Sequence, residues 1–257
     1  MPYSSRRILV FLIFMFLSPL SYARGGDLPY LRALNFLEAR YVPEVGLLKE
    51  HRGSERCWLY NDNFLAYKIL LKHSGYSGVV LSIEDTFRKY NISLDGNGRL
   101  EVLFGHPPNS LPRAGEHMFI EYRNEYSIFT ERPGKILSDW HEYGDLLLYE
   151  VIERFITGKS YHTLWNKAKS MFDGLGIKDK VAIETHKYET YKLALFLLTS
   201  NLLEDNSGEK KEIIDILFRL QDDDGGFITH YDDKFSRLGF SNVETTCFVI
   251  LAGERTR

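Results

Sequence analysis

The stretch LQDDDGGFITHYDD, residues 220–233, decides how the fold of this chain is interpreted. Three consecutive aspartates run into two glycines and an aromatic residue, directly after a segment with helical periodicity. A second apolar segment, NVETTCFVILA at 242–252, follows it. The aspartates at 222–224 could form a catalytic acid cluster, a metal-binding loop or a turn between two helices, and the rest of the chain must decide among these.

The first 23 residues have the layout of a secretory signal peptide. Arg6 and Arg7 precede ten unbroken apolar residues at 8–17, and the segment ends in a small-x-small pattern at 21–23. The apolar run is too short to span a bilayer comfortably, so we expect cleavage. The chain is therefore predicted to be secreted or extracytoplasmic. The alternative is a membrane anchor through an uncleaved N-terminal segment.

Residues 24–257 are predicted to form a single domain. The chain has 32 basic and 35 acidic residues and no long block of either sign. The sequence therefore shows no basic cluster of the kind that binds nucleic acid. Aromatic residues are plentiful, with 17 Phe, 16 Tyr and 3 Trp, enough for a large core and for faces on which sugar rings stack. We expect a monomer whose partner is a carbohydrate or another extracellular polymer.

Amphipathic helices alternate along the chain with helices that are apolar on most faces. One amphipathic segment begins at Asp27, and three others cover 83–90, 160–174 and 209–221. The apolar segments cover 57–72, 139–155, 186–203 and 242–252. An inner layer of helices loses its solvent face, whereas an outer layer keeps one. The alternation therefore predicts a mainly α fold, an α/α toroid or partial toroid of about four helical hairpins.

Residues 92–132 interrupt this alternation. HMFIEYRNEYSIFTE, at 117–131, alternates apolar and polar residues on either side of Arg123-Asn124, which predicts a β-hairpin. The tetrapeptide Asp95-Gly96-Asn97-Gly98 predicts a turn. We therefore expect a small β insertion within the helical domain.

The apolar helices begin with a similar local pattern, at 60–62, 143–145, 188–190 and 243–245. In a ring of hairpins, the starts of all inner helices gather at one end of the central cavity. The predicted catalytic residues are Asp62, Asp145, Glu189 and Glu244. The predicted substrate-binding residues are Trp58, Tyr60, Asn61, Trp140, His141, Tyr143, His186 and Tyr188.

Cleavage of a carbohydrate needs an acid and, in most enzymes, a second carboxylate as base or nucleophile. Asp62 and Asp145 are the first choices, because a carboxyl group at an otherwise apolar helix start has a raised pKa when it is dry. Capping is the alternative for each carboxylate, since acidic residues in the first turn of a helix also complement its dipole.

The segment from Gln221 to Phe227, together with the helix that follows it, resembles the repeats of the terpenoid-cyclase and protein-prenyltransferase toroids. In those repeats a helix ends in Gln, and Asp-Gly-Gly-Phe then leads by a loop into the next inner helix. The resemblance implies that the aspartates at 222–224 belong to a structural turn. It covers about forty residues well, and the rest of the chain only through the helix alternation.

The sequence departs from that family at the positions that would hold a metal. A prenyltransferase-like zinc site needs Asp-x-Cys and a matching His, and neither cysteine follows an aspartate at that spacing. In a calcium loop starting at Asp222, position six would be Phe227, where glycine is required. We therefore expect no metal and no cofactor.

Secreted glycoside hydrolases and polysaccharide lyases form another large group of toroids, and export and abundant aromatics suit that group better. The leading prediction is a secreted carbohydrate-active protein that cleaves a polysaccharide or glycoconjugate by hydrolysis or β-elimination, in a cleft at the inner-helix N-termini. The alternatives are a non-catalytic secreted binding or scaffold protein and, third, an isoprenoid cyclase or transferase.

Cys57 and Cys247 are the two cysteines of the chain. Disulfides persist outside the cytoplasm. A closed ring would place the first and last inner helices side by side, so a disulfide between the two is predicted for that arrangement. In an open arc the two residues would stay apart, each as a small buried hydrophobic residue.

Overall fold

The computed structural model describes residues 27–92, 98–106, 115–122, 126–133, 137–205 and 208–254. The predicted signal peptide and residues 95–97 of the predicted turn lie outside these ranges. The described residues are mainly helical, with small β-hairpins, and their buried apolar side chains form one core. Within the described ranges, no helix has the length and apolar character needed to cross a membrane.

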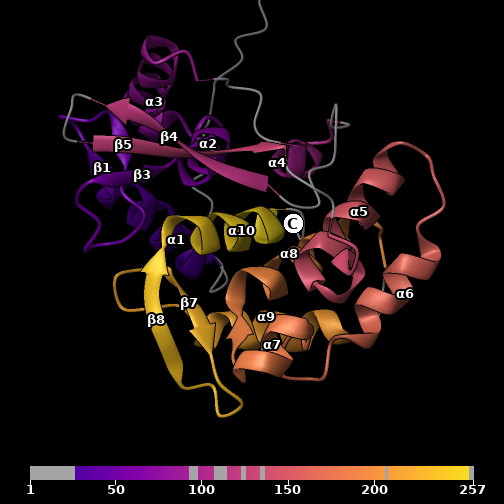
Figure 1. The fold of residues 1–257 in the computed structure, drawn as a ribbon. Coiled ribbons are helices and arrows are strands. Elements are labelled where there is room, and N and C mark those ends of the chain that lie inside the picture. Colours follow the sequence, from indigo (N-terminus) through magenta and orange to yellow (C-terminus); the bar gives the residue numbers. More distant parts are fainter. Residues whose placement is uncertain are drawn as a thin grey trace, which may run out of the picture.

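The predicted alternation of helices is present in the structure (Figure 1). The helices predicted as buried are α2 (Tyr60–Leu70), α5 (Gly144–Ile156), α8 (Thr190–Leu202) and α10 (Val243–Glu254). Those predicted as amphipathic are α1 (Asp27–Ala39), α3 (Ser77–Lys89), α6 (His162–Ser170) and α9 (Glu209–Arg219). Ten of the thirteen residues of α8 are buried, but only Trp165 and Ala168 of α6 are.

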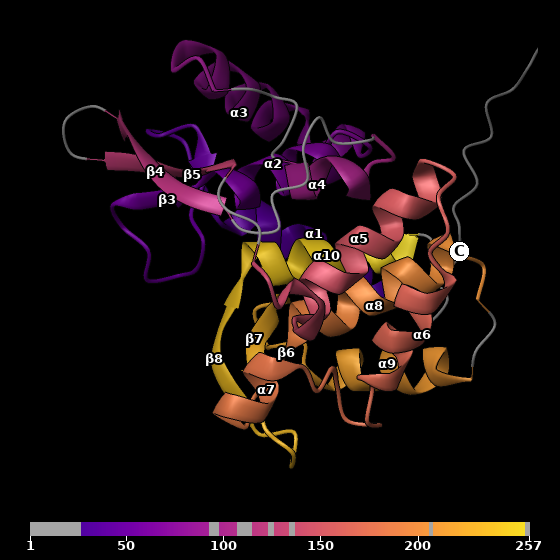
Figure 2. The same ribbon diagram turned by 45° about the vertical axis from the view of Figure 1, so that its right-hand side comes forward.

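The four buried helices pack against one another in the order α2, α10, α8 and α5. Figures 1 and 2 both show α10 crossing the middle of the molecule, with α8 beside it. Both helices are apolar around most of their circumference, so each can contact a neighbour on more than one side. Outer helix α1 covers α10, α9 covers α8 and α6 covers α5.

The predicted β-hairpin is confirmed as β4 (Gly115–Tyr122) and β5 (Tyr126–Pro133). Strand β3 (Cys57–Leu59) pairs with β5 in parallel and runs directly into α2. The insertion is not purely β, because the short helix α4 (Gly98–Leu103) lies within it and packs against α5.

Several short elements were not predicted. Strands β6 (Tyr188–Glu189), β7 (Phe227–Tyr231) and β8 (Arg237–Asn242) form an antiparallel sheet next to α10. Strands β1 (Tyr41–Val42) and β2 (Leu47–Leu48) pair with each other. The remaining elements are α7 (Lys180–Thr185) and two single 3₁₀ turns, η1 (Ser74–Tyr76) and η2 (Trp140–Glu142).

The segment after α9 is a turn that fastens α9 to α1. The side-chain amide of Gln221 donates to the carbonyl oxygens of Pro29, at 2.7 Å, and Gly225, at 2.9 Å. Gly225 has φ of +92°, and a β-carbon on Gly226 would lie 2.5 Å from the ring of Phe36. Both glycines are therefore required by the close approach of the turn to α1.

The aspartates of this turn have structural contacts. The Asp224 carboxylate accepts hydrogen bonds from the Ser241 hydroxyl, at 3.0 and 2.9 Å, and from the amide of Gly226. Asp222 forms an ion pair with Arg237 at 3.2 Å. Neither aspartate lies at the pocket formed by the inner-helix starts, so the interpretation as a structural turn holds.

The predicted disulfide is absent, because Cys57 and Cys247 are both free thiols. Helices α2 and α10 do pack side by side, as the prediction required. However, Cys57 precedes α2 in strand β3, whereas Cys247 is buried in the core one turn into α10. Each residue therefore lies at a different level of the helix pair.

Candidate functional site

The starts of the four inner helices meet at one polar pocket of about 240 Å³. The second residue of each helix lines it: Asn61 of α2, Asp145 of α5, Tyr191 of α8 and Glu244 of α10. The other lining residues are Arg99, Leu100, Tyr149 and Glu189. Three carboxylates from three helix starts therefore share a single pocket.

The chain enters three of these helices in the same extended conformation. The residues just before α2, α5 and α8 are Leu59, Tyr143 and Glu189, with ψ angles of 125°, 121° and 119°. Successive residues of an α-helix are turned by about 100°, so the second residue and the third face different directions. The second residues line the pocket, and the third residues are all buried in the core: Asp62, Leu146, Lys192 and Thr245.

Asp145 and Tyr191 form a hydrogen bond across the pocket. The Tyr191 hydroxyl donates to Oδ2 of Asp145 at 3.1 Å. Burial raises the pKa of Tyr191 well above its ordinary value, and the charges of Asp145, Glu189 and Glu244 raise it further. Tyr191 is therefore a neutral hydrogen-bond donor at ordinary pH and not a base.

Lys192, which is only 2% exposed, forms ion pairs with Glu189 and, at 2.7 Å, with Asp179. Burial by itself lowers the pKa of Lys192, but the charges of Asp145, Glu189 and Asp179 outweigh it and the pKa is raised. The ammonium group therefore stays charged and holds Glu189 at the pocket wall.

Asp179 is fully buried and connects three helix starts. Its Oδ2 accepts the amide hydrogen of Gly144, at 2.8 Å, as well as the Lys192 ammonium. Its Oδ1 accepts the amide hydrogen of Ala182 at 3.0 Å, which caps α7. One carboxylate thus fixes the first turn of α5 relative to that of α8.

Asp62 was predicted as a catalytic residue, but it does not line the pocket. Its side chain is only 1% exposed, because the third residue of α2 faces the core. Burial raises the pKa of Asp62 well above the usual range, and the charges of Glu244 and Glu50 raise it further. Asn61 takes the place at the pocket that was predicted for Asp62.

Three of the predicted substrate-binding aromatics belong to the core. Trp58 and Tyr60 are 2% and 3% exposed. Tyr188 stacks on Tyr231 with ring centroids 5.4 Å apart, and its hydroxyl donates to Asp173 at 2.7 Å. Their side chains cannot stack on a substrate, because other residues already cover them.

The other predicted substrate-binding residues, apart from Asn61, also lie away from the pocket lining. Trp140 and His141 belong to the η2 turn and are half-buried. Tyr143 lies beneath the ammonium group of Lys180, 5.6 Å from the ring centroid. His186 ends α7 with a positive φ of 55° and is exposed.

Sequence reasoning missed four lining residues, Arg99, Leu100, Tyr149 and Tyr191. Tyr191 could have been predicted, because it is the second residue of its helix, as Asp145 and Glu244 are of theirs. Tyr149 lies four residues after Asp145, one turn along the same helix face. Arg99 had no comparable signal, because the glycine-rich sequence before it predicted a turn.

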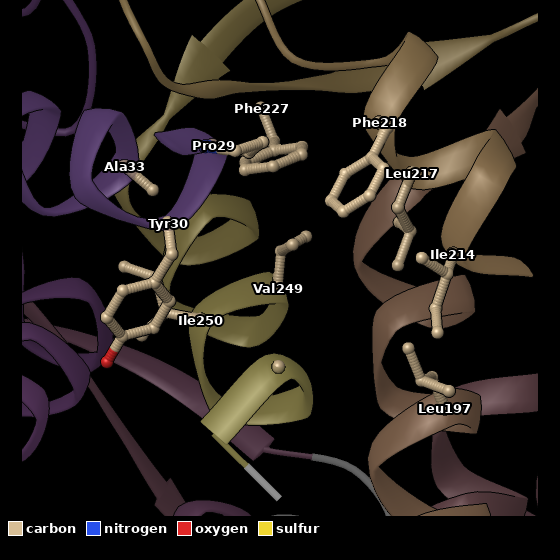
Figure 3. A pocket seen from close by; sticks show the side chains of 11 residues that line it. Pro29, Tyr30, Ala33, Leu197, Ile214, Leu217, Phe218, Phe227, Val249 and Ile250 are labelled. Atoms are coloured by element: carbon tan, nitrogen blue, oxygen red, sulfur yellow. The ribbon is translucent and has the colours of Figure 1, made fainter. Parts of the chain in front are cut away.

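A second pocket, of about 210 Å³, lies between α1, α8, α9 and α10 (Figure 3). Its lining is mostly hydrocarbon, from residues such as Leu197, Leu217 and Val249, and includes no carboxylate. The hydroxyl of Tyr30 points away from it in Figure 3 and donates to Glu254 at 2.9 Å. This lining therefore lacks the carboxylates that the polar pocket offers for acid and base chemistry.

Among the residues that the structure describes, no three His, Cys, Asp or Glu side chains are arranged to hold a metal ion. Comparison of the chain with protein-family models, with curated proteins and with solved structures finds no match. The geometry and chemistry of the polar pocket are therefore the basis for a functional proposal.

Proposed function

We propose that the polar pocket hydrolyses a glycosidic bond of a polysaccharide or glycoconjugate. The observation that carries this proposal is the convergence of Asp145, Glu189 and Glu244 on one pocket. Glycoside hydrolysis uses two carboxyl groups, one that protonates the leaving oxygen and one that acts as base or nucleophile. Three carboxylates from separate helix starts provide such a pair.

The remaining lining residues suit an uncharged substrate with many hydroxyl groups. Asn61 offers an amide oxygen and an amide nitrogen, Arg99 offers a fork of N–H donors, and Tyr149 and Tyr191 offer hydroxyls. Pockets for drug-sized ligands have volumes of roughly 300–1,000 Å³. At about 240 Å³, this pocket fits a single sugar unit of a longer chain.

Hydrolysis fits the charge of the pocket better than β-elimination. Elimination acts beside the carboxylate of a uronic acid, and that carboxylate needs cationic neighbours. Arg99 is the one basic residue among the lining residues, whereas three are acidic. Like charges so close in a partly dry site repel a uronate substrate.

The surroundings of the carboxylates assign different roles to them. Glu189 is held at the pocket wall by its ion pair with the Lys192 ammonium, and we assign it as the base or nucleophile. Asp145 accepts the Tyr191 hydroxyl and is held in position to bind a sugar hydroxyl. Glu244 is the remaining carboxylate of the pocket, and we assign it as the proton donor.

The proposal extends to the fold and the compartment. The row α2, α10, α8 and α5, with outer helices covering it, supports a partial α/α toroid. The Gln221 turn supports a likeness to terpenoid-cyclase and prenyltransferase repeats. Export of the chain rests on the signal-peptide pattern of residues 1–23.

The test is incubation of the purified protein with a panel of polysaccharides and glycoconjugates, with products followed by mass spectrometry. Fragments that carry one added water should appear with the wild type. Glu189→Gln and Glu244→Gln should abolish them, whereas Asp222→Asn, at a half-buried carboxylate outside the pocket, should not. Binding of a glycan without any product, by a folded protein, would instead favour the non-catalytic binding protein.

A further inference from the structure

Five helices surround the polar pocket and close it on its sides. The inner helices pack in the row α2, α10, α8 and α5, so α2 and α5 stand at its two ends. Figures 1 and 2 both show helix α4 of the insertion between these ends. Helix α4 packs against α5, and Phe104, the residue after α4, meets Phe64 of α2 edge to face with ring centroids 5.7 Å apart. Helix α4 therefore joins the two ends of the row into a closed ring of helices.

Burial holds α4 in this place. Leu100 and Leu103 are each 2% exposed, so the apolar face of the helix lies against its neighbours. The ammonium group of Lys68, on α2, lies 5.9 Å from the ring centroid of Phe104 and adds a cation–π attraction to the contact. Arg99 and Leu100 of α4 line the pocket. The insertion thus provides a fifth wall beside the four inner-helix starts.

The pocket is also closed at its base. Its half-buried lining residues, such as Asp145 and Glu244, belong to the helix starts, whereas Tyr149, one turn further along α5, is 6% exposed. The Tyr191 ring packs on Phe248, one turn after Glu244 on α10, with ring centroids 5.7 Å apart. Below this level the inner helices pack on one another through buried apolar side chains. The mouth of the pocket therefore lies on the side of the helix N-termini.

The shape of a binding site decides which part of a polymer can enter it. A bond inside a chain is reached when the chain runs through a groove that is open at two ends. A pocket with walls on all sides and one mouth admits only the end of a chain. At about 240 Å³ this pocket is smaller than the roughly 300–1,000 Å³ of pockets for drug-sized ligands, which limits the part that enters to one sugar unit.

We propose that the polar pocket binds the terminal sugar of a glycan chain, so that the protein removes single sugar units from a chain end. The substrate class is therefore a glycan with a free end. Each event breaks one bond between an anomeric carbon and a glycosidic oxygen and consumes one water, whose hydroxyl joins the carbon and whose proton ends on the oxygen. This inference rests on the proposed function and adds that Arg99 and Leu100, through the wall they form, determine the mode of cleavage.

The early products of a chain of known length test the mode of cleavage. Linear hexasaccharides of cellulose, xylan, mannan, chitin and starch are incubated with the wild type, and the products are followed by mass spectrometry while most of the substrate remains. The pocket should release one sugar unit and leave a chain of five. Early products of two and four units, or of three units, would overturn the inference.

The variant Phe104→Ala tests the part played by α4. Loss of this aromatic ring removes the contact with Phe64, which should free α4 from α2 and open one side of the pocket, so that products of two and four units appear. Phe155→Ala is the matched control, because Phe155 meets Tyr161 in the same edge-to-face arrangement, also at 5.7 Å, and neither residue lines the pocket. The control should keep the wild-type products. Phe104→Leu removes the aromatic contact with a smaller loss of volume if the alanine variant fails to fold.

These outcomes separate the mode of cleavage from the proposed function. A wild type that forms early products of two and four units would leave hydrolysis standing and remove the binding of a chain end. A folded Phe104 variant that still forms only products of one and five units would overturn the role of α4 as the wall that determines the mode of cleavage. A wild type that cleaves none of the hexasaccharides would count against the proposed function, and against this inference with it.

Discussion

Asp179 connects the site to the stability of the fold, and Asp179→Ala should be strongly destabilising. The substitution removes acceptors for the amide hydrogens of Gly144 and Ala182, at 2.8 and 3.0 Å. It also removes one of the two carboxylates that form ion pairs with Lys192. Lys192 is 2% exposed and would keep only Glu189 as its ion-pair partner. Breaking a buried ion pair costs about 3–5 kcal/mol, and an orphaned buried amide costs about 1–3 kcal/mol.

Because Lys192 retains Glu189 and the separate costs overlap, we expect a loss of about 3–5 kcal/mol in the free energy of unfolding. Urea denaturation followed by circular dichroism measures it. Asp232→Ala is the matched control, since Asp232 also accepts two backbone amide hydrogens, from Lys234 and Ser236, but in an exposed turn. The control should lose much less stability than Asp179→Ala, because water can replace the lost acceptor in the exposed turn.

The double variant Asp179→Ala, Lys192→Met tests the cause of the loss. If the uncompensated buried ammonium group dominates, then replacing it with an apolar side chain should recover a large part of the lost stability. An Asp179→Ala variant that is no less stable than Asp232→Ala would refute the reasoning, because the network would then not be what holds the starts of α5 and α8.

Three further predictions concern the core. Gly226→Ala places a β-carbon 2.5 Å from the Phe36 ring, so overpacking should lower stability by about 1–3 kcal/mol, seen as a lower Tm. Because the pKa of Asp62 is raised in the folded protein, its contribution to stability is complete only below the unfolded pKa of about 3.9 and is lost as pH rises. Asp62→Asn should therefore gain in Tm relative to the wild type as pH rises from 4 to 8, and a constant difference would contradict this. Burial raises the pKa of the Cys247 thiol well above its usual value, so Cys247 should resist a thiol reagent until urea unfolds the chain, while the half-buried Cys57 reacts first.

The helical alternation was predictable because it depends on residue pattern alone. Helix α8 is apolar on nearly all faces and α6 on one stripe, and the structure buries them accordingly. The meeting of Asp145, Glu189 and Glu244 followed from the same logic, since inner helices of one layer start at one end. The apolar periodicity of the sequence therefore predicted both the layers of helices and the helix ends at which these carboxylates meet.

The sequence did not reveal which residue of each helix start faces the pocket. Asp62 and Asn61 are neighbours, and their side chains point in directions about 100° apart around the helix. Misjudging the helix start by one residue therefore assigns a core residue to the pocket. Tyr188 was predicted at the start of a helix, but it belongs to strand β6, which pairs with β7. The sequence contains no hairpin pattern that would have predicted this pairing.

The ion-pair network was also beyond sequence reasoning. Lys192 lies in an apolar helix, where a lysine is expected to reach solvent, and its partner Asp179 comes from a separate short helix that was not predicted. The turn at Gln221, by contrast, was interpreted correctly, because its two glycines restrict the backbone in a way that residue type reveals.

Hydrolysis in water enriched in ¹⁸O tests the central claim most directly, that the carboxylates at the inner-helix starts cleave a glycosidic bond with water. Our account predicts that wild-type protein releases sugar fragments carrying one ¹⁸O atom, and that Glu189→Gln releases none while remaining folded. Unlabelled fragments, or labelled fragments formed equally well by Glu189→Gln, would contradict it.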